Sequence, residues 1–141
     1  SYLDAQTLNR KHISNQVFNN PTKLAQLNSL VHPAVYKAFD SWAEIQKSAY
    51  VLKEAALLFE SGSYKQNQKN ILVSSPLDLR IERIIKRDQT TKEKVLERIS
   101  AQLPEEEKLK LADFKIINNE LEFIIPQVLK IHQAIIEIVK K

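Results

Sequence analysis

The sequence predicts an α/β fold with a parallel sheet, and three observations support this prediction. Short apolar runs at residues 50–52, 70–73 and 114–117 are bounded by polar or turn residues, as is typical of strands buried on both faces. Helical periodicity fills the segments around and between these runs. Strands separated by helices pair in parallel through crossover connections. We therefore expect three strands in one sheet, with a helical insertion after the second.

The first 48 residues are expected to be helical. Asn20 and Pro21 form an N-cap and first-turn pair, and the apolar residues that follow recur on one helical face. Because a residue before proline is disfavoured in the α conformation, His32 and Pro33 predict a break and hence two consecutive helices. A shorter helix before them is expected to carry Leu8, His12, Ile13, Val17 and Phe18.

Residues 75–141 hold four further predicted elements besides the last strand. Ser75 and Pro76 are expected to begin a helix that ends near residue 87, and Thr90 with Glu93 forms a capping box for a helix ending near residue 101. A third, short helix after Pro104 has acidic residues in its first turn, which suit the helix dipole. The last helix is predicted to bury one face, made of Leu121, Ile124, Ile125, Val128, Ile131, Ile135 and Ile138.

The composition excludes several classes of function. One glycine in 141 residues cannot build a phosphate-binding P-loop or a dinucleotide-binding turn. Without cysteine, disulfide and thiol chemistry are excluded. No apolar run is long enough to span a membrane and no signal peptide is visible, so a cytoplasmic protein is expected. The net charge of +4 suits an anionic partner without requiring one.

An arginine stripe is the most informative candidate site. On a helix, Arg80, Arg83 and Arg87 share one face beside the apolar face of Ile81 and Ile84. Guanidinium groups offer planar forks of donors that match phosphate oxygens, so the stripe could bind a polyanion. A solvated face paired with nearby carboxylates explains the same pattern, and without further information we favour that interpretation.

Acidic and histidine side chains give weaker signals. Glu54 and Glu60 follow a predicted strand, and ligands of open parallel sheets bind at the carboxyl ends of strands. Capping or solvated glutamates are the alternative. His32 could bind a hydroxyl or phosphate, or could cap a helix junction. The other two histidines lack companions at metal-ligand spacing, so no metal site is expected. Tyr36, Phe39 and Trp42 share helical spacing and are expected in the core.

Several motifs together resemble the dephospho-CoA kinase family in order and spacing. These are Leu8-Asn9-Arg10, Val17-Phe18, Leu27-Asn28-Ser29-Leu30-Val31-His32-Pro33, Leu57-Leu58-Phe59-Glu60-Ser61-Gly62, Arg83-x-x-x-Arg87-Asp88, Arg98-x-x-x-Gln102 and Ala112-Asp113-Phe114-x-Ile116-Ile117 with Asn118 or Asn119. The resemblance runs along essentially the whole chain. Two departures are Asn9, where the family usually has Asp, and Ala56, where it often has Pro.

The resemblance implies a P-loop kinase-like three-layer fold and transfer of the ATP γ-phosphate, with Mg²⁺, to the ribose 3′-hydroxyl of dephospho-CoA in the last step of coenzyme A biosynthesis. Its substrate-binding positions would be Arg10, His32, Glu54, Leu58, Phe59 and Glu60. Arg83, Arg87 and Arg98 would belong to a lid over the ATP phosphates, and Asn118 or Asn119 to the adenine end of the ATP site. The stripe thereby becomes a predicted functional feature, because phosphoryl transfer depends on positioning and charge stabilisation.

The resemblance also implies four regions within one partial kinase domain. Residues 1–48 would bind the acceptor, 49–76 would supply core strands and the acceptor loop, 77–111 the lid, and 112–141 the last strand and helix. The family's first strand, P-loop and general base would lie upstream of Ser1. The chain has no methionine, and we expect a fragment that is inactive alone.

Two alternatives stay open. A non-catalytic module could present its basic helical face to nucleic acid or an acidic protein, and the strand count and the place of Glu54 distinguish it from a kinase. A related nucleotide or nucleoside kinase would share the lid but differ in residues 8–33. The leading hypothesis expects ATP and dephospho-CoA as small-molecule partners, no nucleic acid, no membrane, and a monomer or weak homo-oligomer.

Overall fold

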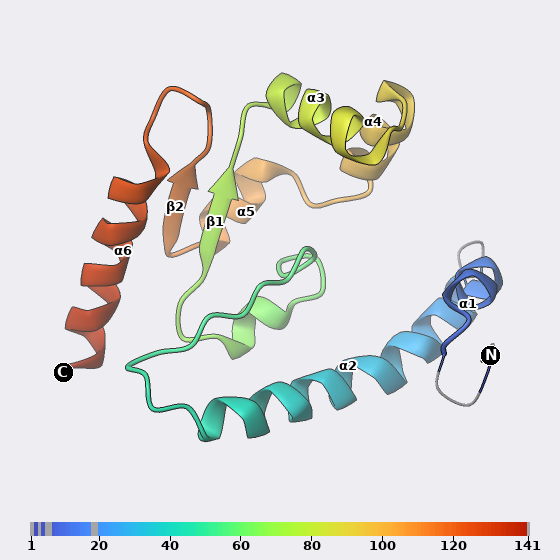
Figure 1. Cartoon of the computed structure of the whole chain (residues 1–141), viewed down its shortest axis with the longest axis horizontal. Helices are drawn as coiled ribbons and strands as arrows, with labels where there is room; N and C mark the ends of the chain where they lie inside the picture. The colour runs from blue at the N-terminus through green and yellow to red at the C-terminus, as the bar shows by residue number, and fades with distance from the viewer. Residues whose placement is uncertain (1, 3, 5–6, 18–19, 141) are drawn as a thin grey trace. The chain divides into compact units, whose positions relative to one another are not determined.

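The computed structural model describes residues 2, 4, 7–17 and 20–140. Phe18, expected in the first helix, lies outside the described residues. The chain divides into two compact units, residues 1–51 and 52–141, each of which is described by itself. Figure 1 shows their elements, with helices in both units and strands in the second.

The first unit consists of two helices. Helix α1 spans Arg10–Val17, and the Asn9 side chain accepts a hydrogen bond from the His12 N–H at 3.0 Å at its start. Helix α2 spans Pro21–Glu44, and Asn20 caps it by accepting from the Lys23 N–H at 3.0 Å. The predicted cap and first-turn proline are therefore confirmed.

The predicted break at His32 and Pro33 is wrong. Helix α2 continues through Pro33 as one element of 24 residues. Proline inside a helix removes one backbone hydrogen bond and costs about 3 kcal/mol. Helical segments of more than two turns flank Pro33 on both sides, and each residue added to a formed helix contributes its own hydrogen bond. The helical hydrogen bonds of the two flanking segments thus outweigh the local proline signal.

The second unit holds a two-stranded parallel sheet. Strand β1 (Ile71–Ser74) pairs with β2 (Phe114–Ile117), with Ile71 opposite Phe114 and Ser74 opposite Ile117. Helices α3 (Leu77–Asp88), α4 (Lys92–Ser100) and α5 (Glu105–Leu111) form the connection between the strands. Helix α6 (Ile124–Val139) packs against β2 (Figure 1). The predicted parallel α/β arrangement with a helical insertion is confirmed.

Two sequence-based strand predictions need correction. The run at residues 50–52 forms no strand, because a strand requires a hydrogen-bonded neighbour and β1 and β2 pair only with each other in the described part of the chain. The strand expected at residues 70–73 is β1, which begins one residue later. Asn70 lies before β1 because its N–H donates to the Asp113 carboxylate at 2.8 Å.

Two helix starts differ from the predicted caps by one residue. Helix α3 begins at Leu77 with Pro76 as the N-cap residue, and α4 begins at Lys92 with Thr91 as the N-cap residue. Ser75 lies one residue too early to cap α3. The capping box expected from Thr90 is also displaced, because Thr91 takes the extended conformation that precedes the first helical turn.

The core is small and lies in the second unit. Phe59, Ile81, Val95, Ile131 and Ile135 are its buried apolar side chains among the described residues. The predicted core face of α6 is therefore only partly correct: Ile131 and Ile135 are buried, whereas Leu121 precedes the helix and Ile125 is 73% exposed. A two-stranded sheet offers α6 too narrow a surface to cover its whole apolar face.

The aromatic residues of α2 are also more exposed than expected. Trp42 is 46% exposed, and Tyr36 and Phe39 are partly exposed. Their rings pack along the helix instead, with Phe39 and Trp42 centroids 5.7 Å apart and Tyr36 6.0 Å from His32. Among the described residues, helix α2 has no buried residue, and α1 is the helix that packs against it within the first unit.

Candidate functional site at the carboxyl end of the parallel strands

The carboxyl ends of β1 and β2 bring several polar groups together. Ser74 ends β1 and Ile117 ends β2, and the Asn118 N–H extends the ladder by donating to the Ser74 carbonyl at 2.8 Å. Because parallel strands place all their carboxyl ends at one edge, the segments after β1 and β2 meet there. This edge is where ligands of open parallel sheets bind.

Arg83 joins the two loops at this edge. Its Nη1 donates to the Asn118 carbonyl at 3.3 Å and to Ser75 Oγ at 3.4 Å, and its Nη2 donates to Glu120 Oε1 at 2.9 Å. The guanidinium thus connects α3 to the loop after β2. Arg83, one of the three arginines of the predicted stripe, therefore lies at the carboxyl end of the parallel strands.

Glu120 holds this contact in an unusual backbone conformation. Its φ of 67° lies in the left-handed region, which glycine adopts freely and other residues adopt at a cost of about 1–2 kcal/mol. Its side chain is 63% exposed, so the pair with Arg83 is largely hydrated. A phosphate oxygen could replace this carboxylate at low cost.

Arg87 and Arg98 are brought together by one carboxylate. Asp88 Oδ1 accepts from Arg87 Nε at 2.7 Å, and Asp88 Oδ2 accepts from Arg98 Nη1 at 3.1 Å. The hydrogen bond from Arg87, reinforced by Arg98, lowers the pKa of the Asp88 carboxyl below its usual value. Helices α3 and α4 therefore present two exposed guanidinium groups that share one carboxylate. The role of Arg87 and Arg98 in a lid stays a prediction.

The two asparagines after β2 differ in what their side chains do. Asn119 Oδ1 accepts from the N–H groups of Leu121 at 3.1 Å and Glu122 at 2.9 Å, which shapes the loop. Asn118 contributes its main chain to β1 and Arg83, as described above. Of the two positions predicted for the adenine end, Asn118 is the one whose side chain is not used by the loop hydrogen bonds.

Residues 56–62 form a turn, here called the acceptor turn, which contains the Leu57–Gly62 motif predicted to face the acceptor. Phe59 is buried and its ring lies 5.7 Å from that of Tyr64. Gly62 ends the turn with φ of 74°, a conformation that favours glycine. Leu58 is half-buried, and its carbonyl accepts hydrogen bonds from the Ser61 and Ser63 hydroxyl groups at 3.3 Å. The turn is therefore a compact, internally bonded element.

Glu60 anchors the acceptor turn to α5. Its Oε1 accepts from Lys108 Nζ at 2.6 Å and from the Leu103 N–H at 3.1 Å. Burial raises the pKa of the Glu60 carboxyl, but these hydrogen bonds and the charge of Lys108 outweigh burial and bring the pKa below its usual value. Glu60 is thus held as a carboxylate by contacts within the protein.

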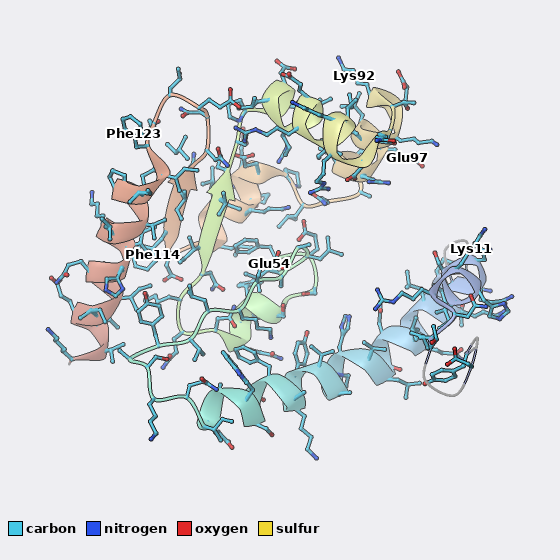
Figure 2. The ribbon with its side chains drawn as sticks, in the orientation of Figure 1. Lys11, Glu54, Lys92, Glu97, Phe114 and Phe123 are labelled. Atoms are coloured by element: carbon cyan, nitrogen blue, oxygen red, sulfur yellow. The ribbon has the colours of Figure 1, made fainter. Side chains whose placement is uncertain are left out.

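Three further predicted substrate-binding residues lie outside the acceptor turn, and they are Glu54, Arg10 and His32. Glu54 lies in an irregular, exposed segment (Figure 2), so its predicted place at a strand end is wrong because that strand does not form. Arg10 and His32 are exposed on α1 and α2, in the first unit. His32 lies within α2 and not at a helix junction. Their roles at an acceptor site stay predictions.

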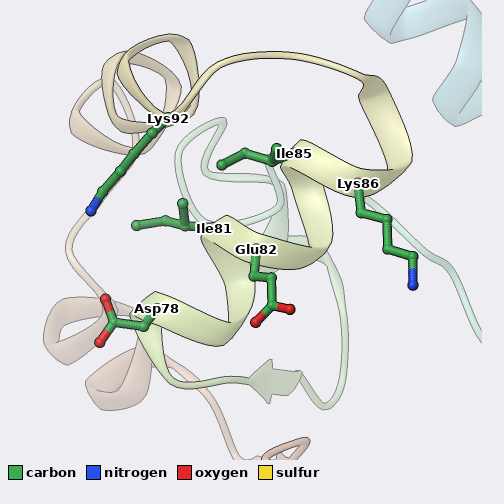
Figure 3. Close-up of a pocket in the computed structure, with 6 residues that line it drawn as sticks. All are labelled: Asp78, Ile81, Glu82, Ile85, Lys86 and Lys92. Carbon is green, nitrogen blue, oxygen red and sulfur yellow. The ribbon is translucent and has the colours of Figure 1, made fainter.

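A groove of about 370 Å³ lies on the surface between α3 and the start of α4. Figure 3 shows its lining residues, which are Asp78, Ile81, Glu82, Ile85, Lys86 and Lys92. Side chains of both charge signs line the groove. Among residues 2, 4, 7–17 and 20–140, no cluster of three or more His, Cys, Asp or Glu side chains could hold a metal ion.

Sequence reasoning missed three side chains that build the site. Lys108 and Glu105 lie on α5 and contact segments more than 30 residues away, for which no local pattern exists. Gln127 of α6 accepts from the Ile117 N–H at 2.7 Å and donates to the Ile117 carbonyl at 3.0 Å. The helical position of each residue was predictable, but its distant partner was not.

No helix in the described part of the chain is long and apolar enough to cross a membrane. The fold and site define a class: an α/β protein with a parallel sheet and an arginine-bearing helical insertion between its strands. A family model described as dephospho-CoA kinase matches residues 2–122. The chain belongs to the dephospho-CoA kinase family.

Curated relatives named dephospho-CoA kinase support this assignment. The chain is 34% identical to the one from Bacteroides fragilis over 125 residues, covering 88% of the chain and 61% of the relative. It is 46% identical over 110 residues to the one from Leptospira interrogans, covering 77% and 53%. It is 36% identical over 132 residues to the one from Legionella pneumophila, covering 93% of the chain and 66% of the relative. The chain thus spans about half to two thirds of these relatives.

A solved structure agrees with the fold. The crystal structure of TT1252 from Thermus thermophilus matches with a TM-score of 0.83 at 32% sequence identity, over 94% of this chain and 70% of that protein. The two proteins are therefore similar in both fold and sequence. The α/β fold predicted from the sequence is therefore confirmed by both the computed structure and the comparison.

Proposed function

We propose that this chain forms the acceptor and lid parts of a dephospho-CoA kinase. In the reaction, the ribose 3′-hydroxyl of dephospho-CoA attacks the γ-phosphorus of MgATP. The new bond joins O3′ to phosphorus, the bond to the β–γ bridging oxygen breaks, and ADP leaves. The hydroxyl proton passes to a base that the proposal places in the P-loop portion of the family.

The observation that carries the proposal is the family match over residues 2–122, which includes every predicted acceptor and lid position. The chain contains no P-loop motif, because its single glycine cannot build one. Arg83 at the carboxyl end of the strands supports a phosphate-binding role, because ligands of such sheets bind at that edge. Arg87 and Arg98, held together through Asp88, would close over the phosphates.

The chemical role of the lid follows from the reaction. Charge on the transferring phosphoryl group is spread over its oxygens, and pre-positioned guanidinium donors stabilise it. Closing a cationic lid also excludes water, which would otherwise compete as the acceptor. We expect Arg87 and Arg98 to exchange Asp88 for phosphate oxygens when ATP is bound.

A coupled assay tests the proposal. A protein of full family length, in which a P-loop segment precedes this chain, should form ADP only when dephospho-CoA is present, and chromatography should show CoA as the product. The 141-residue chain alone should give no turnover. ADP formation with other nucleosides but not with dephospho-CoA would contradict the assigned acceptor, and full activity of the chain alone would contradict the partial-site assignment.

A further inference from the structure

Helix α5 holds the acceptor turn through a shielded ion pair. The Lys108 and Glu60 side chains are only 14% and 17% exposed. Glu60 Oε1 accepts hydrogen bonds from both Lys108 Nζ and the Leu103 N–H, whereas Glu60 Oε2 is buried and has no hydrogen-bond partner among the described residues. The position of the Glu60 carboxylate therefore depends on Lys108 and the start of α5.

Glu105, in the first turn of α5, contacts β1 and α3. Glu105 lies three residues before Lys108, so both side chains lie on one face of the helix. Glu105 Oε1 accepts from the Ser74 hydroxyl, and its Oε2 lies 3.6 Å from Arg80 Nη1. Ser74 is the buried last residue of β1, and Arg80 lies in the first turn of α3.

We propose that α5 is a clamp that joins the acceptor turn to the base of the lid helix α3, with Lys108 and Glu105 as positioning residues. The catalytic role of the clamp rests on the proposed function, whereas its contacts are observed within this chain. One short helix ties the turn through Lys108 and ties β1 and α3 through Glu105. A displacement of the turn would therefore be carried to the first turn of α3.

Both ends of the clamp are sensitive to the loss of a partner. Without Lys108, the Glu60 carboxylate would keep only backbone donors, among them the Leu103 N–H, and would lose its counter-charge in a shielded place. Arg80 Nε is likewise buried without a hydrogen-bond partner in the part of the chain that the structure describes, so Glu105 provides the nearby counter-charge of its guanidinium. Each end thus has one charged partner and no second anchor of the same kind.

The same helix supplies a matched control. Lys110 pairs with Glu107 at 2.6 Å, the same length as the Lys108–Glu60 pair, but these side chains are 68% and 50% exposed. The Lys110 pair lies within α5 and connects it to no other element. Lys110→Met therefore removes one lysine and one ion pair from α5 without touching the clamp.

Hydrogen exchange of the 141-residue chain tests the clamp without any catalytic assay. We expect Lys108→Met to speed amide exchange in residues 56–62 at least tenfold and to speed exchange in the first turn of α3 as well. Lys110→Met should change neither segment by more than about twofold. Unchanged exchange in both segments of Lys108→Met, or equal changes in Lys110→Met, would overturn the proposal.

A double variant separates positioning from stability. Lys108→Met combined with Glu60→Gln removes both charges, so no uncompensated carboxylate stays buried and the unfolding midpoint should return close to that of wild type. In a protein of full family length, this folded double variant should still raise the KM for dephospho-CoA at least tenfold, with a change in the KM for ATP of less than threefold. A wild-type KM in the double variant would show that the pair is only structural.

The two proposals fail in different ways. If the full-length wild-type protein does not phosphorylate dephospho-CoA, the proposed function is wrong, and the exchange experiment still decides the clamp. If wild-type turnover is present and Lys108→Arg does not restore part of the acceptor affinity lost in Lys108→Met, the positioning role of Lys108 is wrong. Protected amides at residues 56–62 in every variant would reject the clamp whatever the kinetics.

Discussion

The acceptor turn and the lid both use ion pairs, but the pairs lie in opposite environments. Glu60 and Lys108 are separated by 2.6 Å and are mostly shielded from water. Arg87 and Asp88 are separated by 2.7 Å, yet Arg87 is 75% exposed, and Arg98 on the same carboxylate is 61% exposed. The distances are nearly equal, so they do not distinguish the two regions.

Exposure decides what each pair can do. Breaking a shielded pair leaves a charge without water or partner, so such a pair fixes geometry. An exposed pair contributes little to stability, because water and salt compete with it. The acceptor turn is therefore built to stay in place, whereas the lid arginines can leave Asp88 for another anion at low cost.

The largest effect should come from the lid and should appear in turnover. In a protein of full family length, Arg87→Ala should lower kcat about 100-fold, the scale expected for a lost donor to a developing charge. The KM for dephospho-CoA should change less than about twofold. Steady-state kinetics with Lys86→Ala as the neighbouring cation control measures this difference, and an unchanged kcat would show that the stripe is only solvated.

The acceptor turn should show its effect in stability. In the 141-residue chain at pH 7, Glu60→Gln should lower the free energy of unfolding by about 1.5–3 kcal/mol, the range for hydrogen bonds to charged groups. Urea unfolding of both proteins measures the difference. Glu107→Gln, which changes an exposed partner on α5, should have an effect below about 0.5 kcal/mol.

This difference should depend on pH in one direction. The pKa of Glu60 is lower in the folded protein than its ordinary value of 4.5, because Lys108 and the Leu103 N–H favour the carboxylate despite its burial. Its contribution is therefore fully present above pH 4.5 and is lost as the pH falls through the folded-state pKa. The difference in the free energy of unfolding between wild type and Glu60→Gln should therefore become smaller at low pH. A difference that does not change with pH would contradict the ion-pair explanation.

A smaller effect of opposite sign is expected at Glu120. Glu120→Gly should raise the free energy of unfolding by about 0.5–1 kcal/mol, because glycine adopts its positive φ without strain and the exposed pair with Arg83 contributes little. Glu120→Gln keeps the strain and removes the charge, so it should leave stability nearly unchanged. Thermal unfolding measures both, and a loss of stability in Glu120→Gly would show that the Arg83 contact matters more.

The smallest effect should occur at Asp88. Asp88→Asn makes the same chemical change as Glu60→Gln but at an exposed pair, so the free energy of unfolding should fall much less than it does in Glu60→Gln. Urea unfolding of the two variants in parallel is the direct comparison of the two regions. Equal losses of unfolding free energy in the two variants would mean that exposure does not explain the difference between the lid and the acceptor turn.

Local sequence signals predicted much of the fold. The cap at Asn20, the start of the acidic helix after Pro104, the strand at Phe114–Ile117 and the turn at Gly62 all depend on residues a few positions apart. Such short-range chemistry does not need knowledge of distant partners. The same holds for the arginine stripe, whose helical face follows from spacing alone.

The failures concern competition and distance. Pro33 predicted a break, but two long helical segments outweighed it. The run at residues 50–52 has strand character, but no other strand pairs with it in the described residues, and pairing is not a local property. Lys108 was not predicted as a site residue, because its partner Glu60 lies 48 positions earlier and only the folded chain brings them together.

The side chain of Gln127 has a consequence for the behaviour of the second unit in solution. Its amide offers one donor and one acceptor to the N–H and carbonyl of Ile117, as a residue of a neighbouring strand would. Unpaired strand edges are templates for association with other chains, and natural proteins protect them. A foreign strand joining β2 at Ile117 would first have to displace the Gln127 amide from both of these hydrogen bonds.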